Sequence, residues 1–390
     1  MPAPDRNDYL DYAASAPLRR EALDAMARYD DEVFAGANPN SLHTLGRLAA
    51  QALEGARRNV ASSLGRRVRP SEVAFTGGGS EANFIALIGM AEGARDRDRT
   101  KTRVLVSAIE HDSVLDNLSE LKRRGFSVDT IVPEADGAVS VSSLEEALAD
   151  GGVALVSIML ANNETGALQP VSELTRIAHR HGALFHADAI QGYLHVPFDV
   201  VDLDADALSV AGHKVGAPAS IGALYLKART PFRPVSHGGG QEGGVRPGTQ
   251  DVRSALALAA VAHSLAPHVP EVCQEVRAVS DALYRQVGSA RRISPTLPDP
   301  LACDRLPGIV SLTVEGMESE ELILKLDSLG FEVSAASACS SGSLDASHVL
   351  AAMGIPRERA LGSLRISFDE RVPAEDVIAF GDALVGIVGA

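Results

Sequence analysis

Residues 206–225 read DALSVAGHKVGAPASIGALY and place one lysine, Lys214, between two apolar runs of the kind that form buried strands. Gly212 and Gly216 let the backbone bend on either side of this lysine. A lysine held after a short buried strand is partly desolvated, which suits an amine that forms a Schiff base. The alternative is an ordinary surface lysine in a loop rich in glycine and proline. The rest of the chain has to decide between them.

Length and charge limit the class of protein. The 390 residues exceed the roughly 250–300 at which single hydrophobic cores stop growing, so we expect one large and one smaller domain. A net charge of −15 argues against a broad contact with a phosphate backbone, so we expect no direct nucleic-acid substrate. The chain has no uninterrupted apolar run of about 18 residues and no basic, then apolar, N-terminus. We therefore expect no membrane span and a cytoplasmic location.

Apolar runs alternate with helical stretches through the first half of the chain. The expected strands are 104–109, 127–132, 154–160 and 183–187, and the expected helices between them are 112–124, 141–149 and 170–181. Near-continuous apolar strands in this alternation indicate a largely parallel sheet covered by helices. Beyond an expected domain border at 266–290, the order strand, helix, strand at 309–334 predicts a smaller α+β domain.

Polar clusters follow the expected strands. They are Glu110-His111-Asp112, residues 162–166 (NNETG), residues 186–191 (HADAIQ) and His213-Lys214. Each cluster alone fits a loop whose side chains bond their own backbone. Because ligands of parallel sheets collect at the carboxyl ends of the strands, an aromatic base, an amide, a carboxylate and a lysine should meet there. This combination predicts a catalytic site.

A short expected strand at 73–75 runs into the Gly-rich stretch 76–83, TGGGSEAN, and then into an expected helix at 84–94. Glycines let the backbone approach an anion, Ser80 is suited to cap the helix and bond the anion, and the helix dipole adds partial positive charge. We expect a phosphate cradle, with a simple tight turn as the alternative. A second Gly-rich stretch, 237–249, is a candidate for another phosphate arm.

The chain has three cysteines, Cys273, Cys303 and Cys339. They are too few and too scattered for a disulfide framework, and none forms a Cys-x-x-Cys pair, so we expect no metal site. Cys339 lies among small residues at 334–343, which favours an accessible, reactive thiol over a buried one.

Two further polar residues stand out in the C-terminal part. Arg365, on the short expected strand 364–367, suits either a bidentate carboxylate contact or a surface ion pair. Ser319 is expected to cap the helix at 319–329.

Taken together, these residues resemble the class V aminotransferases, and most closely the pyridoxal-phosphate (PLP)-dependent cysteine desulfurases of the NifS and IscS type, over nearly the whole chain. The motifs that carry the resemblance are YLDYAA (9–14), GGSEAN (78–83), EH (110–111), NNETG (162–166), HADAIQ (186–191), GHK (212–214), RPGT (246–249) and SACSSGS (337–343). The resemblance implies a PLP-dependent transferase of fold type I. It implies a large domain at 18–266 with a mainly parallel seven-stranded sheet. A smaller α+β domain, from 1–17 and 267–390, would carry the cysteine loop.

The resemblance also implies residue roles around PLP. Lys214 would hold the cofactor and His111 would stack on its ring. Asp188 would pair with the pyridinium nitrogen, which makes the ring an electron sink. Gln191 would reach the phenolic oxygen, and Asn163 the ring edge or the substrate carboxylate.

Further roles concern the phosphate and the substrate. The residues implied to hold the phosphate are Gly79, Ser80, His213 and Thr249. In this family the position of Thr249 belongs to the partner subunit, which implies a homodimer with shared sites. Arg365 would grip the substrate carboxylate, and Asn38, in the polar loop 36–43, is an expected substrate contact.

The implied reaction converts L-cysteine to L-alanine, and Cys339 receives the sulfur as a persulfide. The sulfur would pass to an acceptor protein for iron-sulfur clusters or for another thio-cofactor or tRNA pathway. The alternatives are another class V enzyme, such as a selenocysteine lyase or an aminotransferase, and a non-catalytic regulatory subunit with the same fold.

The chain departs from the family pattern at several points. Ala211 replaces the usual serine, Ala219-Ser220 the usual Lys-Gly, and Asp369-Glu370 the usual Gly-Arg. The printed sequence also lacks the C-terminal extension with which housekeeping members dock their scaffold. We therefore expect weaker phosphate binding and an accessory desulfurase that feeds another sulfur pathway.

Overall fold

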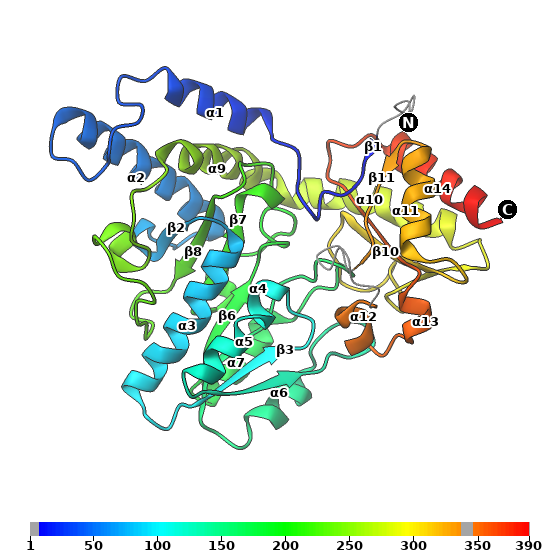
Figure 1. Ribbon diagram of the computed structural model, residues 1–390, viewed down its shortest axis with the longest axis horizontal. Helices are drawn as coiled ribbons and strands as arrows, with labels where there is room; N and C mark the ends of the chain where they lie inside the picture. The colour runs from blue at the N-terminus through cyan, green and yellow to red at the C-terminus, as the bar shows by residue number, and fades with distance from the viewer. Residues whose placement is uncertain (1–7, 337–345, 390) are drawn as a thin grey trace.

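The computed structural model describes residues 8–336 and 346–389. Figure 1 shows a large body made of the blue to green elements and a smaller one made of the yellow to red elements. The first strand, β1 (Asp8–Tyr9), lies with the smaller body.

The large body is built on a seven-stranded sheet with strand order β2-β8-β7-β6-β5-β3-β4. The strands are β2 (Val73–Thr76), β3 (Arg103–Ser107), β4 (Ser127–Ile131), β5 (Val153–Ser157), β6 (Leu184–Asp188), β7 (Ala207–Ala211) and β8 (Gly222–Leu226). The five strands from β7 to β4 are parallel, whereas β8 is antiparallel to both its neighbours. The predicted α/β fold with a mainly parallel seven-stranded sheet is confirmed.

Helices cover both faces of this sheet. They are α1 (Arg20–Asp30), α2 (Thr44–Leu64), α3 (Gly79–Arg97), α4 (Asp112–Leu115), α5 (Leu118–Arg123), α6 (Val141–Leu148), α7 (Val171–Arg180), α8 (Val200–Leu203) and α9 (Val252–Leu265), with 3-10 turns η1 (Pro70–Glu72), η2 (Gly212–Lys214) and η3 (Gln241–Gly244). On β3, Leu105 packs into the core beneath α1, α2, α7 and α9, whereas Val104 and Val106 pack under α3. Because both faces are buried, the central strands β3, β5, β6 and β7 are largely apolar, whereas the edge strand β4 is mostly exposed.

The smaller body has its own core. Its strands are β9 (Ile293–Pro295), β10 (Ile309–Val314), β11 (Phe331–Glu332) and β12 (Ser363–Ser367), and its helices are α10 (Val269–Val287), α11 (Ser319–Ser328), α12 (His348–Ala352), α13 (Arg357–Ala360) and α14 (Ala374–Gly389). β1 pairs in parallel with β11, and Leu10 is fully buried in this core. This pairing supports our proposal that 1–17 and 267–390 form one small domain and 18–266 the large one.

One helical run joins the two bodies. α9, the 3-10 turn η4 (Ala266–His268) and α10 together have the length and apolar composition of a membrane span. α9 packs against α1 and α2, and α10 packs against α14. The expected border at 266–290 is therefore mostly helix.

Several local predictions were wrong. Ser319 does not cap α11, because its hydroxyl donates to the carbonyls of Leu361 and Ser363, at 2.8 and 2.6 Å. Ser80 does not cap α3: Gly78, at a φ of 137°, allows the helix to begin at Gly79. The expected helix 112–124 is divided into α4 and α5, and α14 was not foreseen.

Candidate active site

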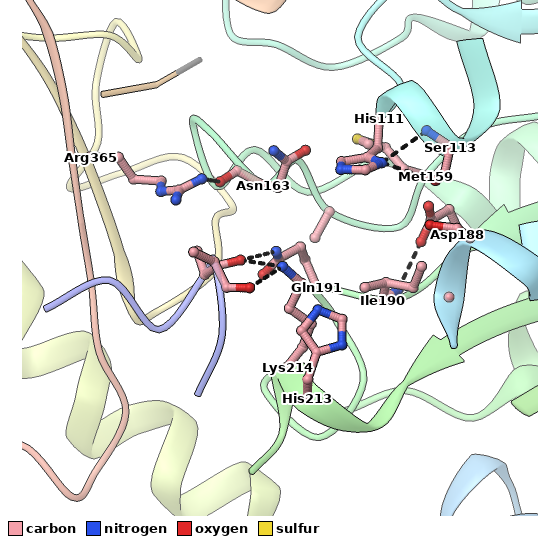
Figure 2. A pocket seen from close by; sticks show the side chains of 15 residues that line it. His111, Ser113, Met159, Asn163, Asp188, Ile190, Gln191, His213, Lys214 and Arg365 are labelled. Carbon is pink, nitrogen blue, oxygen red and sulfur yellow. Dashed lines mark hydrogen bonds between the residues drawn. The ribbon is translucent and has the colours of Figure 1, made fainter. Parts of the chain in front are cut away.

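A cavity opens at the carboxyl ends of the parallel strands. Its lining residues are Ala13, Ala14, Gly79, Ser80, His111, Ser113, Met159, Ala161, Asn163, Asp188, Ile190, Gln191, His213, Lys214 and Arg365. The polar clusters after β3, β5, β6 and β7 therefore meet at one edge of the sheet (Figure 2). Of the other residues predicted for the site, Asn38 and Thr249 are exposed and do not line this cavity. Cys339 lies outside the described residues.

Lys214 ends η2, directly after β7. Its Nζ donates to the carbonyls of Ala13 and Ala14, at 2.6 and 2.8 Å. These carbonyls belong to the segment between β1 and α1, which closes the cavity over the lysine. Gln191 Nε2 also donates to the Ala13 carbonyl, at 2.9 Å, so the same segment holds the amide side chain. The alternative of a surface lysine in a loop is therefore wrong.

Asp188 is the last residue of β6 and only 4% exposed. The Ile190 N–H donates to Oδ1 at 2.9 Å, and Asn83 Nδ2 donates to Oδ2 at 2.6 Å. Burial raises the pKa of Asp188, and the two hydrogen bonds, with His111 and Lys214 nearby, oppose that rise. A carboxylate so held can pair with a cationic ring nitrogen.

His111 precedes α4 and serves as its N-cap. The backbone N–H of Ser113 donates to His111 Nδ1 at 3.0 Å. Because a backbone N–H can only donate, Nδ1 is an acceptor and the neutral ring carries its proton on Nε2. Figure 2 shows the imidazole on the side of the cavity opposite Lys214 and His213.

The N-terminus of α3 forms another part of the wall. A Cβ at Gly79 would lie 2.2 Å from Ile190 Cδ1, so any larger residue there would have to displace the Ile190 side chain. The helix N-terminus and Ser80 supply donors for an anion. Burial, followed by the charges of Lys214 and His111, lowers the pKa of His213 to about 4. His213 is therefore neutral at pH 7 and can donate one ring N–H.

Arg365 reaches the cavity from β12 of the small body, on the side of Figure 2 opposite Asp188. Its side chain is only 3% exposed. Its Nη2 donates to Asp11 Oδ1 at 2.8 Å, and its Nη1 to the Asn163 carbonyl at 3.1 Å. Within residues 8–336 and 346–389, its Nε has no hydrogen-bond partner. Arg365 therefore forms a largely buried ion pair with Asp11, not a surface one, and as a cavity-lining residue it is placed to meet a carboxylate.

A buried carboxyl group lies behind the lining. Glu164, in the loop after β5, is 4% exposed and accepts a hydrogen bond from Ser347 Oγ. Burial raises the pKa of Glu164 to about 7, although the Ser347 bond and the charge of Arg365 lower it. Ser347 also caps α12, where it accepts from the Leu350 N–H at 3.2 Å. Glu164 therefore ties the large body to α12.

Four polar residues in or behind the cavity wall had no predicted role: Asp11, Asn83, Ser113 and Glu164. Asp11, Asn83 and Glu164 belong to motifs that carry the family resemblance. The motifs therefore single these residues out, but they do not predict which side chains they contact. Ser113 lies two residues beyond the EH motif and gave no signal of its own. Among the described residues, no group of three or more His, Cys, Asp or Glu side chains is placed to hold a metal ion.

The family model for class V aminotransferases matches residues 8–380. The chain belongs to the class V aminotransferase family. It is 39% identical over 386 residues to an IscS-like cysteine desulfurase of Mycobacterium tuberculosis, covering 97% of this chain and 96% of that protein. It is 35% identical over 383 residues to the cysteine desulfurase IscS of Dictyoglomus turgidum, and the match covers 98% of this chain and 95% of that protein.

Solved structures give the same result for the fold. A NifS-like protein matches with a TM-score of 0.88 and 31% identity, covering 98% of this chain and 99% of that one. SspA, solved in complex with cysteine, matches with a TM-score of 0.79 and 32% identity, covering 93% and 99%. The class V fold is thus present along nearly the whole chain.

Proposed function

We propose that this protein is a cysteine desulfurase, which converts L-cysteine to L-alanine and takes the sulfur onto Cys339 as a persulfide. One observation carries the proposal: a single cavity in a class V chain brings together Lys214, Asp188, His111 and Arg365. Cysteine desulfurases are the relatives that this chain matches over nearly their full length.

The cavity fits pyridoxal 5'-phosphate as the cofactor. Lys214 offers the amine for the aldehyde carbon, and the buried Asp188 suits the pyridinium nitrogen. The residues that would hold the phosphate are Gly79, Ser80, His213 and, from a partner subunit, Thr249. The absence of a side chain at Gly79 supports this assignment, because a Cβ there would crowd Ile190 in the cavity wall. When bound, PLP supplies an electron sink for the α-carbon of the substrate.

The protein's own side chains orient the substrate and handle its protons. The Arg365 guanidinium faces the cavity from the small body and suits the substrate carboxylate, with the Asn163 amide beside it. Lys214 Nζ is the base placed to take the α-proton, and Gln191 holds the segment that covers it. Because Nδ1 accepts from the Ser113 N–H, the neutral His111 ring carries its proton on Nε2 and can donate it in the cavity. We also propose Asn38 as a substrate contact.

The sulfur step balances without an outside oxidant. The substrate C–S bond breaks, an S–S bond to Cys339 forms, the carbon skeleton gains a hydrogen in place of the thiol, and alanine leaves. The Cys339 thiol is the nucleophile and is oxidised to the persulfide level. A reductant or an acceptor protein then removes the terminal sulfur.

We further propose a cytoplasmic homodimer that passes sulfur to an acceptor protein. The exposed Thr249 supports the dimer, since in its own subunit it does not line the cavity. The departures from the family pattern at Ala211 and Asp369-Glu370 support an accessory enzyme that feeds a sulfur pathway other than the usual iron-sulfur scaffold.

The test is a paired product assay. Purified protein is given L-cysteine and a reductant, and alanine and sulfide are measured together for wild type, Lys214→Ala, Cys339→Ala and Cys273→Ala. Wild type should release alanine and sulfide in equal amounts, and so should Cys273→Ala, which is the matched cysteine control. Lys214→Ala and Cys339→Ala should release neither product. Full activity of Cys339→Ala would refute the persulfide step and leave a selenocysteine lyase or aminotransferase.

A further inference from the structure

Asn83 lies directly behind the cavity wall and has no role in the function proposed above. It belongs to the second turn of α3 and is fully buried. Its Nδ2 lies 2.6 Å from Asp188 Oδ2 and 2.9 Å from Ser113 Oγ. Asn83 therefore touches the residue that would face the ring nitrogen and a neighbour of the residue that would stack on the ring.

The orientation of the Asn83 amide follows from its partners. An ionised carboxylate can only accept, so the amide must present its NH₂ group to Asp188. The second proton of that group points to Ser113 Oγ. The carbonyl Oδ1 has no hydrogen-bond partner in the part of the chain that the structure describes.

Ser113 continues the same chain of hydrogen bonds. Its Oγ accepts from Asn83 and lies 2.9 Å from His111 Nδ1, to which its own N–H also donates. The hydroxyl proton is therefore directed to Nδ1. The Asn83 NH₂ group thus donates one hydrogen bond to Asp188 and one to Ser113, and the Ser113 hydroxyl donates in turn to His111.

We propose that Asn83 is a positioning residue that holds Asp188 ionised and in line with the cofactor's ring nitrogen, and that joins it through Ser113 to the Nε2–H form of His111. This inference rests on the proposed PLP site. It goes beyond that proposal because it assigns the residue that fixes Asp188 and His111 relative to each other. A charge-assisted hydrogen bond at 2.6 Å is among the strongest that a neutral side chain makes.

The surroundings of Asp188 show what the loss of Asn83 would do. The titratable groups around Asp188 are Glu110, His111 and Lys214. Burial favours the neutral form of Asp188, whereas the bonds from Ile190 and Asn83 and the nearby His111 and Lys214 favour the ionised one. Removal of the Asn83 bond raises the pKa of Asp188, so its pairing with the ring nitrogen fails at a higher pH.

The experiment measures PLP binding to protein prepared without PLP, from pH 5.5 to 9, by absorbance and without substrate. We expect Asn83→Ala to raise the PLP dissociation constant at pH 7 roughly 10- to 100-fold. It should also raise, by about one unit, the pH below which PLP binding is lost, which is the acid limb of the binding profile. Asn83→Asp should move the limb further, since two carboxyl groups in contact cannot both be ionised.

Asn117→Ala is the matched control. Asn117 Nδ2 donates to the Ser113 carbonyl at 2.7 Å, so this variant loosens the same loop without removing a bond to Asp188. It should leave the acid limb in place. The proposal would be overturned if the acid limb of PLP binding moved by the same number of pH units in Asn117→Ala and Asn83→Ala. It would also be overturned if the acid limb of Asn83→Asp lay at the same pH as that of wild type. Asn83→Asp keeps the native shape and decides the question alone if Asn83→Ala does not fold.

The same data separate this inference from the proposed function. A protein that binds PLP and shows the Asn83 shift but converts no L-cysteine refutes only the proposed reaction. A wild-type protein that does not bind PLP refutes both. Cysteine turnover with an unchanged limb in the Asn83 variants refutes the positioning role alone.

Discussion

Replacement of Glu164 by glutamine should stabilise the protein, and more so as pH rises. Glu164 is buried, and its pKa is raised to about 7 from an ordinary 4.5. Between these two values the folded protein holds a proton that the unfolded chain has already released. Stability therefore falls as pH rises from about 4.5 to about 7, and the loss stays constant above that. Glutamine does not titrate, and its carbonyl can still accept from Ser347.

The size of the effect follows from the pKa. A rise from 4.5 to about 7 corresponds to about 3 kcal/mol at 1.36 kcal/mol per pKa unit. At about 2.1 cal/mol/K per residue, the entropy of unfolding of 390 residues is about 0.8 kcal/mol/K. The melting temperature of Glu164→Gln should thus exceed that of wild type by about 4 °C at pH 8.5 and by only about 1 °C at pH 5.

Thermal unfolding at pH 5, 7 and 8.5 measures this difference. Glu134→Gln serves as the charge-matched control, because Glu134 is exposed and its replacement removes the same charge from the surface with little effect on stability. The reasoning is wrong if the gap between Glu164→Gln and wild type is the same at all three values, or if it narrows as pH rises.

Three further predictions concern the cavity. Gly79→Ala should weaken PLP binding measured by absorbance while the fold, followed by circular dichroism, is kept, because the new methyl would lie 2.2 Å from Ile190 Cδ1 and push that side chain into the cavity. Normal binding would contradict the cradle. Mixing Thr249→Ala with Lys214→Ala subunits should restore about a quarter of wild-type turnover, because half of the dimers would be hybrids with one intact site. No recovery after subunit exchange would place Thr249 in its own subunit's site. Arg365→Lys should raise the KM for L-cysteine roughly tenfold or more, since an ammonium cannot replace the bidentate fork; an unchanged KM would show that another group binds the carboxylate.

The sequence by itself determined the class of fold and much of the cavity. Apolar strands alternating with helices can be buried only in a parallel sheet covered on both faces, and polar residues after such strands must meet at its edge. Lys214, Asp188, His111 and Asn163 could be placed together for this reason. Their positions depend on local pattern and on the direction of the chain, which a linear sequence records.

Only the tertiary structure decided which side chains pair behind that edge. Asn83 and Asp188 are 105 residues apart, Glu164 and Ser347 are 183 apart, and Asp11 and Arg365 are 354 apart. Such pairs depend on strand order, on the start of α3 at Gly79, and on how β12 and α12 lie against the large body. The same packing turned Arg365, which the sequence left open as a surface residue, into a buried cation at the cavity. Local propensity does not encode these contacts, because burial and register are set by elements that meet only once the chain has folded.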